Sequence, residues 1–218
     1  MLQFLHKNGL SVVFFVLFII SLGGQLFTGF AEHNKELQEE GGNTISLPQY
    51  VNSGHFIQAT FENWESEFLQ MALLVLLTIW LRQKGSSESK KLNELEEVDA
   101  EPDRTKKDAP WPVRRGGWIL SIYKNSLSIA LGLLFIISFV LHFCGSLKDE
   151  NEHLFMKGKP QESAAEYLAD SRFWFESFQN WQSEFLSIFA IIVLSIYLRQ
   201  KGSSQSKPVD APHGATGQ

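Results

Sequence analysis

The polar motif Asn-Trp-x-Ser-Glu-Phe-Leu occurs twice in the 218-residue chain, with Glu67 in the first copy and Glu184 in the second. Each copy leads into a strongly apolar run, where an ionised carboxylate is costly unless it has a partner or a function. On a helix with 3.6 residues per turn, Asn63, Glu67 and Gln70 fall within about 80° of one another. Asn180 and Glu184 lie on the corresponding stripe of the second copy. A polar face of this kind should point towards partner helices or water.

Two polar residues in other apolar runs, Gln25 and His142, are expected at a similar depth. One interpretation is that Glu67, Glu184 and His142 form a cluster that handles protons or cations. The other is that the glutamates are hydrated near the membrane surface and make hydrogen bonds between helices. We favour the second interpretation, because a charge near a helix end costs less than one at the bilayer centre. Duplication of the motif favours it too, since both copies could serve the same packing contact.

Four apolar segments can position these residues. Leu10–Phe30 and Leu127–Leu147 contain no Asp, Glu, Lys or Arg, and each has about the 20 residues that a helix needs to span a hydrocarbon core. Phe68–Leu81 and Phe185–Leu198 are shorter, but helical aromatic stripes precede both and extend them. The first segment lacks a small-residue cleavage site, so we interpret it as a retained helix and not a signal peptide. The predicted transmembrane helices cover about residues 10–30, 64–82, 127–147 and 181–199.

The ends of the two shorter helices carry residues typical of a membrane surface. Trp64 and Trp181 are expected to anchor one end, because tryptophan is enriched at the membrane–water interface. Arg82 and Arg199 stand at the other end, where their guanidinium groups can reach lipid phosphates. These flanking residues are the reason why the shorter segments also count as spans.

The whole chain is a tandem duplication. Comparing residues 7–90 with residues 124–207, at a constant offset of 117, gives 33 identities in 84 pairs without a gap. The repeats are predicted at residues 7–84 and 124–201, each with two helices, so the two repeats should have the same orientation in the membrane.

Ser46 with Gln49, and Ser163 with Glu166, predict capping boxes that start a short helix in each repeat. The polar segments 85–117 and 202–218 cannot bury a core and are predicted to be a disordered linker and tail.

The charge distribution predicts the orientation. Fourteen of the 19 Lys and Arg residues lie before the first helix, in the central segment or in the tail. The positive-inside rule therefore places both termini and the central segment in the cytoplasm, with the chain in the inner membrane.

Several functions are not indicated by any pattern in the sequence. The single cysteine, Cys144, excludes an internal disulfide, and the histidines His6, His33, His55, His153 and His213 show no ligand spacing, so no metal or other cofactor is expected. No phosphate-binding loop, dinucleotide fingerprint, nucleophile elbow or zinc-protease motif occurs. No basic aromatic face suggests nucleic acid, and no enzymatic activity is predicted.

Three sequence strings carry a resemblance to a known family. They are the duplicated Asn-Trp-x-Ser-Glu-Phe-Leu, the string Leu-Arg-Gln-Lys-Gly-Ser-Ser-x-Ser-Lys that follows each copy, and Trp-Pro-Val-Arg-Arg-Gly-Gly between the repeats. Together they resemble a family of uncharacterised bacterial membrane proteins, a domain of unknown function, over nearly the whole chain. The resemblance implies a bacterial membrane location but no activity and no catalytic residue.

The sequence thus predicts an all-α integral membrane protein with four transmembrane helices, in two parallel two-helix repeats. Two classes of function are left open. The first is a non-enzymatic structural or interaction protein of the bacterial envelope. The second is a small proton- or ion-coupled transporter or channel that uses the stripes around Glu67 and Glu184. The expected partner is the lipid bilayer, together with a second copy of the chain or another membrane protein.

Overall fold

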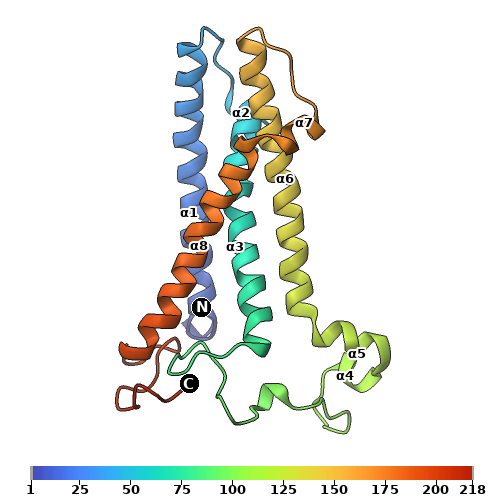
Figure 1. Ribbon diagram of the computed structural model, residues 1–218, viewed down its shortest axis with the longest axis vertical. Coiled ribbons are helices and arrows are strands. Elements are labelled where there is room, and N and C mark those ends of the chain that lie inside the picture. The colour runs from blue at the N-terminus through green and yellow to red at the C-terminus, as the bar shows by residue number, and fades with distance from the viewer. Residues whose placement is uncertain (1, 218) are drawn as a thin grey trace. The chain divides into compact units, whose positions relative to one another are not determined.

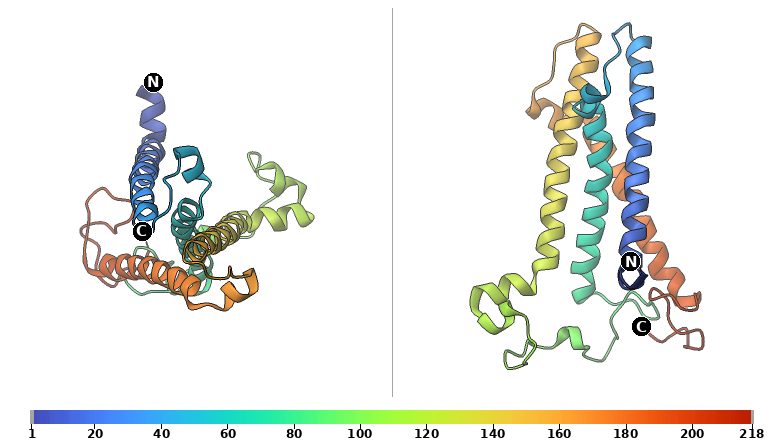
Figure 2. Two further views of the ribbon diagram at one scale, coloured as in Figure 1. Left: turned by 90° about the horizontal axis from the view of Figure 1, so that it is seen from above. Right: turned by 180° about the vertical axis from the view of Figure 1, so that it is seen from behind.

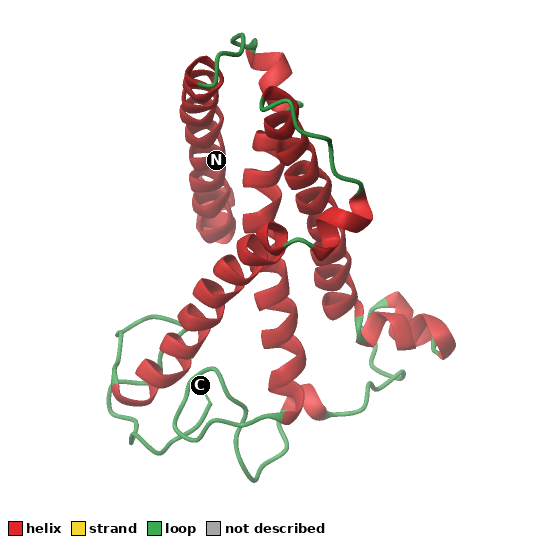
Figure 3. Ribbon diagram, turned by 45° about the horizontal axis from the view of Figure 1, so that its top comes forward, coloured by secondary structure: helices red, strands yellow, loops and turns green. Residues whose placement is uncertain are grey.

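The computed structural model describes residues 2–217, and Figure 1 labels its helices in chain order. The helices are α1 (Leu2–Glu39), α2 (Leu47–Val51), α3 (Gly54–Trp80), the 3-10 helix η1 (Glu97–Asp99), α4 (Trp111–Arg115), α5 (Gly117–Lys124), α6 (Ser126–Met156), α7 (Ala164–Ala169) and α8 (Ser171–Tyr197). Between residues 2 and 217 there is no strand, and Figure 3 shows helices joined by loops and turns alone. The predicted all-α fold class is confirmed.

Three of the helices that the structure describes are long and apolar enough to cross a membrane: Gln3–Glu39 in α1, Ser126–Met156 (α6) and Ser171–Tyr197 (α8). Large apolar side chains on these helices, such as Phe14, Leu127 and Phe189, are exposed, as expected where the surroundings are lipid. The fourth predicted span, α3, is not one of the three. Three glutamates, Glu62, Glu65 and Glu67, occupy its middle, and the 13 residues from Phe68 to Trp80 that follow them include Gln70 and Thr78.

The chain forms two compact units, each with segments from both halves of the sequence. Unit 1 comprises Met1–Phe61 and Val140–Phe173, and unit 2 comprises Glu62–Phe139 and Trp174–Gln218. The boundary passes through α3, α6 and α8, so each of these helices contributes one part to each unit.

In unit 1, the loops after α1 and α6 are closed in the same way at positions 117 residues apart. The Asn34 side chain accepts a hydrogen bond from the Ile45 backbone N–H at 2.7 Å and donates one to the Ile45 carbonyl at 3.2 Å. Asn151 binds the backbone of Glu162 in the same two ways, at 2.7 and 3.0 Å. A single side chain thus satisfies both backbone groups of the loop residue that it faces.

The two predicted capping boxes are confirmed. The backbone N–H of Ser46 donates to the Gln49 side chain, and that of Ser163 donates to the Glu166 carboxylate, both at 2.8 Å. These caps start α2 and α7, and α2 lies against α1 (Figure 2). Each short helix buries one tyrosine, so the caps determine where that side chain enters the unit.

Two glycines allow α3 and α6 to approach closely in unit 1. A Cβ atom added to Gly54 would lie 2.3 Å from the backbone nitrogen of Asp149. A Cβ atom added to Gly145 would lie 2.5 Å from the backbone nitrogen of Gln58. Small residues at helix contacts are typical of membrane proteins, because they let two backbones approach.

In unit 2, α3 and α8 end in the same way. Each terminal arginine donates from Nη1 to three carbonyls that the helix leaves without an internal partner. Arg82 binds the carbonyls of Thr78, Ile79 and Leu81, and Arg199 binds the equivalent carbonyls of Ser195, Ile196 and Leu198. The predicted surface anchors therefore also cap their own helices.

The two segments predicted to be disordered both belong to unit 2. Residues 85–117 contain turns, η1 and α4, whereas residues 202–217 contain turns and loops, and residue 218 lies outside the described residues. Lys207 is 2% exposed. Its ammonium donates to the carbonyls of Gly85, of His213 at 2.9 Å and of Ala215 at 2.8 Å. These bonds connect the tail to the start of the central segment.

Candidate functional site

Polar side chains near the two motifs connect α3 to α8 within unit 2. The indole N–H of Trp181 donates to Glu65 Oε1 at 2.8 Å, and Glu65 is completely buried. One residue earlier on α8, the Asn180 amide donates to Glu62 Oε1 at 3.2 Å. Hydrogen bonds to a carboxylate are stronger than bonds between neutral groups. Glu65 of the first motif and Glu62 just before it thus supply the acceptors, and the second motif supplies the two donors.

A further contact joins two equivalent residues. Gln70 Nε2 donates to Ser187 Oγ at 3.2 Å, and these two positions are 117 residues apart, which is the offset between the repeats. The same amide also approaches the Glu184 carbonyl at 3.5 Å. Gln70 is 8% exposed.

The two glutamates that the motif suggested are not the buried ones. Glu67 is exposed, Glu184 is half-buried, and Asn63 is exposed. The buried carboxylate belongs to Glu65, two residues before Glu67. Two residues correspond to about 200° around a helix, so Glu65 and Glu67 point in nearly opposite directions. The sequence does distinguish Glu65 from Glu67 in one respect. Glu67 aligns with Glu184, whereas the position equivalent to Glu65 carries Gln182.

The two predicted partners from the long apolar helices belong to unit 1, whereas the motif glutamates belong to unit 2. Gln25 donates from Nε2 to the Thr60 hydroxyl at 3.2 Å and so connects α1 to α3. His142 is completely buried, and its ring lies 5.0 Å from the ring of Phe173, centroid to centroid. Both residues therefore contact neighbouring helices, as expected for polar groups on membrane helices.

The two tryptophans predicted as anchors lie at equivalent positions of α3 and α8. Trp64 and Trp181 are both half-buried, and the indole N–H of Trp181 is directed to Glu65. A tryptophan that is buried in part usually directs its N–H to a polar partner.

The two equivalent tyrosines of unit 1 use their hydroxyl groups differently. Tyr167 shares a hydrogen bond of 2.5 Å with the Ser146 hydroxyl, whereas Tyr50 OH lies 3.1 Å from His55 Nδ1. Position 29, equivalent to Ser146, is a glycine on which a Cβ atom would lie 2.3 Å from the Tyr50 hydroxyl. Burial, together with the negative charges of Glu36 and Asp149, raises the pKa of Tyr50 to about 12, so its hydroxyl is neutral at physiological pH.

A family model for a domain of unknown function, DUF6766, matches residues 1–218. The chain belongs to the DUF6766 family. Among curated proteins and among solved structures, none matches this DUF6766 chain. The resemblance to a domain of unknown function is thus confirmed over the whole chain, and the family supplies no activity and no site residue.

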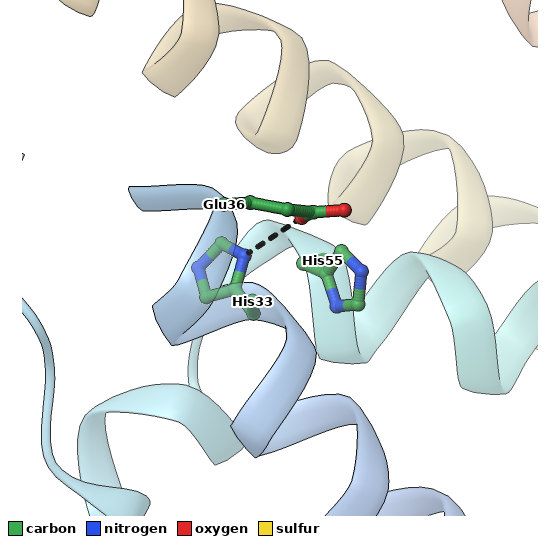
Figure 4. Close-up of side chains that lie close together, drawn as sticks. All are labelled: His33, Glu36 and His55. Atoms are coloured by element: carbon green, nitrogen blue, oxygen red, sulfur yellow. Dashed lines mark ion pairs between the residues drawn. The ribbon is translucent and has the colours of Figure 1, made fainter. Parts of the chain in front are cut away.

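Unit 1 of the DUF6766 chain also contains charged and ring side chains that were not predicted as a site. Arg172 Nη2 binds Asp149 Oδ2 at 2.8 Å, and its Nη1 binds Glu150. In the first repeat, His33, Glu36 and His55 lie together at the end of α1 and the start of α3 (Figure 4), and they could hold a metal ion.

The sequence did not predict this group of three residues, because a loop and a short helix separate His55 from the other two. The His33-x-x-Glu36 spacing, which places both residues on one face of a helix, was the one local signal.

Proposed function

We propose that this DUF6766 protein is a non-enzymatic structural or interaction protein of the bacterial inner membrane, with four transmembrane helices in two parallel repeats. The contact between Gln70 and Ser187 carries this proposal. When equivalent residues of two repeats touch, a twofold axis passes close to that contact. The bonds from Trp181 to Glu65 and from Asn180 to Glu62 join positions 116 and 118 apart, close to the offset of 117. α3 and α8 are therefore partners across such an axis, which supports α3 as the fourth span.

The use of the polar groups supports a structural role. In unit 2, the side chains of Glu65, Trp181 and Gln70 are engaged in bonds between α3 and α8. A cavity of about 540 Å³ is lined by the same two helices, from Gln70 and Phe185 onward, and by residues of the segment that follows α3, among them Glu88. Eight of its 15 lining residues are leucine, isoleucine or phenylalanine, which suits an acyl chain or an apolar helix better than a hydrated ion. The protein would then bind the lipid bilayer and associate with a second copy or another membrane protein.

A cross-linking experiment tests the proposed axis. With Cys144→Ser as background, the pair Gln70→Cys and Ser187→Cys should form a disulfide in native membranes under mild oxidation. The control pair, Met71→Cys with Ser187→Cys, moves one cysteine by 100° around α3 and should form little. Equal cross-linking of both pairs, or none in either, would contradict the contact between equivalent residues.

The orientation has its own test. Fourteen Lys and Arg residues on one side against five on the other predict cytoplasmic termini. A reporter fused after Lys207 should be active only in the cytoplasm. Activity of a periplasm-specific reporter at the same position would refute the topology with four spans.

The alternative function, transport of protons or ions, is supported by one observation. Glu67 and Glu184 occupy equivalent positions on the two helices that the bond between Gln70 and Ser187 joins. Proton flux into vesicles should then fall in the double variant Glu67→Gln with Glu184→Gln, while the control variant Glu94→Gln with Glu97→Gln, in the central segment, keeps wild-type flux. Absence of flux in the wild type favours the structural role.

A further inference from the structure

His33, Glu36 and His55 bring three metal-binding groups together within unit 1. His33 and Glu36 are three residues apart near the end of α1 and share one face of that helix. His55 is the second residue of α3 and faces them (Figure 4). One ligand atom from each residue lies within 4.8 Å of the others. The two imidazole rings stack with their centroids 4.8 Å apart, and His33 Nδ1 lies 3.9 Å from Glu36 Oε2.

The environment of His33 indicates that its ring nitrogen faces a ligand. The residue is 3% exposed, and its Nδ1 is buried without a hydrogen-bond partner among the described residues. Buried polar atoms in folded proteins nearly always have a partner, so an exception needs an explanation. This nitrogen is the atom directed at Glu36, on the side where His55 also lies. A cation bound by the three residues would supply the missing partner.

Tyr50 orients His55 for such a role. Its hydroxyl lies 3.1 Å from His55 Nδ1, and Tyr50 is 1% exposed. The phenol oxygen can accept a hydrogen bond from Nδ1–H, which leaves the electron pair on Nε2 of His55 free to bind an ion. Metal-binding histidines almost always donate a hydrogen bond from the N–H of their other ring nitrogen to a fixed partner.

The second repeat gives independent support, because it fills the same place with a cationic side chain. At the offset of 117, His33, Glu36 and His55 correspond to Glu150, His153 and Arg172. Arg172 binds both Glu150 and Asp149, so a permanent positive charge sits among the carboxylates of that copy. The first repeat has two imidazoles and a carboxylate at these positions. The first repeat therefore has only groups that can donate an electron pair to a metal ion, whereas the second repeat already contains a cation, Arg172, paired with carboxylates.

We propose that His33, Glu36 and His55 form a binding site for a divalent transition-metal ion, with zinc as the first candidate. Two imidazole nitrogens and one carboxylate oxygen suit zinc, cobalt and nickel, whereas magnesium and calcium prefer oxygen ligands alone. Zinc binds such atoms at about 2.0–2.2 Å. Ligand atoms that lie within 4.8 Å of one another need only modest side-chain rotation to reach that geometry. Three protein ligands leave one position of a tetrahedral ion open for water or a further ligand.

The bound ion would join the end of α1 to the start of α3 across the loop that contains α2. The site lies beyond the apolar run Leu10–Phe30, on the side that the positive-inside rule places outside the cytoplasm. An ion from that compartment could thus reach it without crossing the membrane.

The test uses the full-length protein in detergent, purified through a tag without histidine and stripped with a chelator. Titration with zinc chloride by calorimetry, and with cobalt chloride by visible absorption, should give one ion per chain. Glu36→Gln, which keeps the side-chain shape, and His55→Ala should each lower the affinity by about 100-fold or more. Loss of a ligand costs more than loss of a residue that only hydrogen-bonds a ligand, which lowers affinity by about 10- to 100-fold. Tyr50→Phe should lower it by about 10- to 100-fold.

His6→Ala is the matched control, since His6 is exposed on the same helix and should leave the affinity unchanged. Circular dichroism of each metal-free variant shows whether it still folds. If His55→Ala does not fold, the affinity of Glu36→Gln alone tests the metal site. Absence of binding in the wild type would overturn the proposal. So would wild-type affinity in both Glu36→Gln and His55→Ala, which would indicate an ion bound elsewhere.

Discussion

Replacing Gly145 with alanine should loosen unit 1, whereas the same change elsewhere on α6 should not. The added Cβ atom would lie 2.5 Å from the backbone nitrogen of Gln58 and 2.8 Å from the Ile57 side chain. Ordinary contact begins at 3.4 Å, so α3 and α6 must separate by nearly 1 Å within the unit. A backbone nitrogen cannot rotate away as a side chain can. Overpacking of this kind costs about 1–3 kcal/mol.

The matched control is Gly132→Ala, on the same helix, where no atom lies within 4 Å of the added Cβ. Alanine there should be neutral or should stabilise by up to about 1 kcal/mol, because glycine is a poor helix former. Thermal unfolding in mild detergent, followed by circular dichroism, measures both variants. At about 2–4 °C per kcal/mol for a chain of this size, Gly145→Ala should unfold about 2–12 °C below wild type. Equal midpoints for the two variants would refute the close approach of α3 and α6.

Two further changes test the polar contacts. Glu184→Gln should be mild, because the amide still forms hydrogen bonds, and Glu184→Leu should lower the unfolding midpoint if the carboxylate packs against a helix. Hydrogen bonds between membrane helices are worth about 0.6 kcal/mol on average, which sets the size of the expected difference between the two variants. Equal unfolding midpoints for the two would argue against the packing role. Arg172→Met should destabilise unit 1 by about 2–3 kcal/mol, because it leaves the nearly buried Asp149 without its cation. That value is below the usual cost, since the Arg172 side chain is 33% exposed. The variant Arg115→Met, outside unit 1, is its control, and equal midpoints would contradict the role of the ion pair.

The helices and their caps could be predicted from local sequence. Apolar runs such as Leu10–Phe30 determine a spanning helix through length and composition, and a capping box depends on two residues three apart. Such features need no knowledge of what packs against them.

The candidate sites depended on contacts that local pattern does not contain. The predicted stripe runs through Glu67 and Gln70, and of these Gln70 is buried, but the buried carboxylate is that of Glu65. Helical periodicity gives the relative angles of residues on one helix and not the direction of the neighbouring helix. Either side of α3 could therefore have been the one that contacts α8. Likewise, His55 meets His33 only because the loop between α1 and α3 returns the chain past Tyr50, and that path depends on tertiary packing.

The unequal pair of sites in unit 1 leads to a final prediction, which exchanges one repeat's chemistry for the other's. His33→Glu, Glu36→His and His55→Arg together give the first repeat the residues that the second has at Glu150, His153 and Arg172. If a metal ion and the arginine fill the same structural place, the triple variant should fold without metal and keep a wild-type unfolding midpoint. It should also lose the rise in midpoint that zinc produces in the wild-type protein, because a ligand that binds only the folded state stabilises it. The single variant His55→Arg lacks the new carboxylate at position 33 and should be less stable than the triple variant. A triple variant that still responds to zinc would place the ion elsewhere. One that does not fold would show that the two sites are not interchangeable, so the comparison between the repeats would no longer support the metal site.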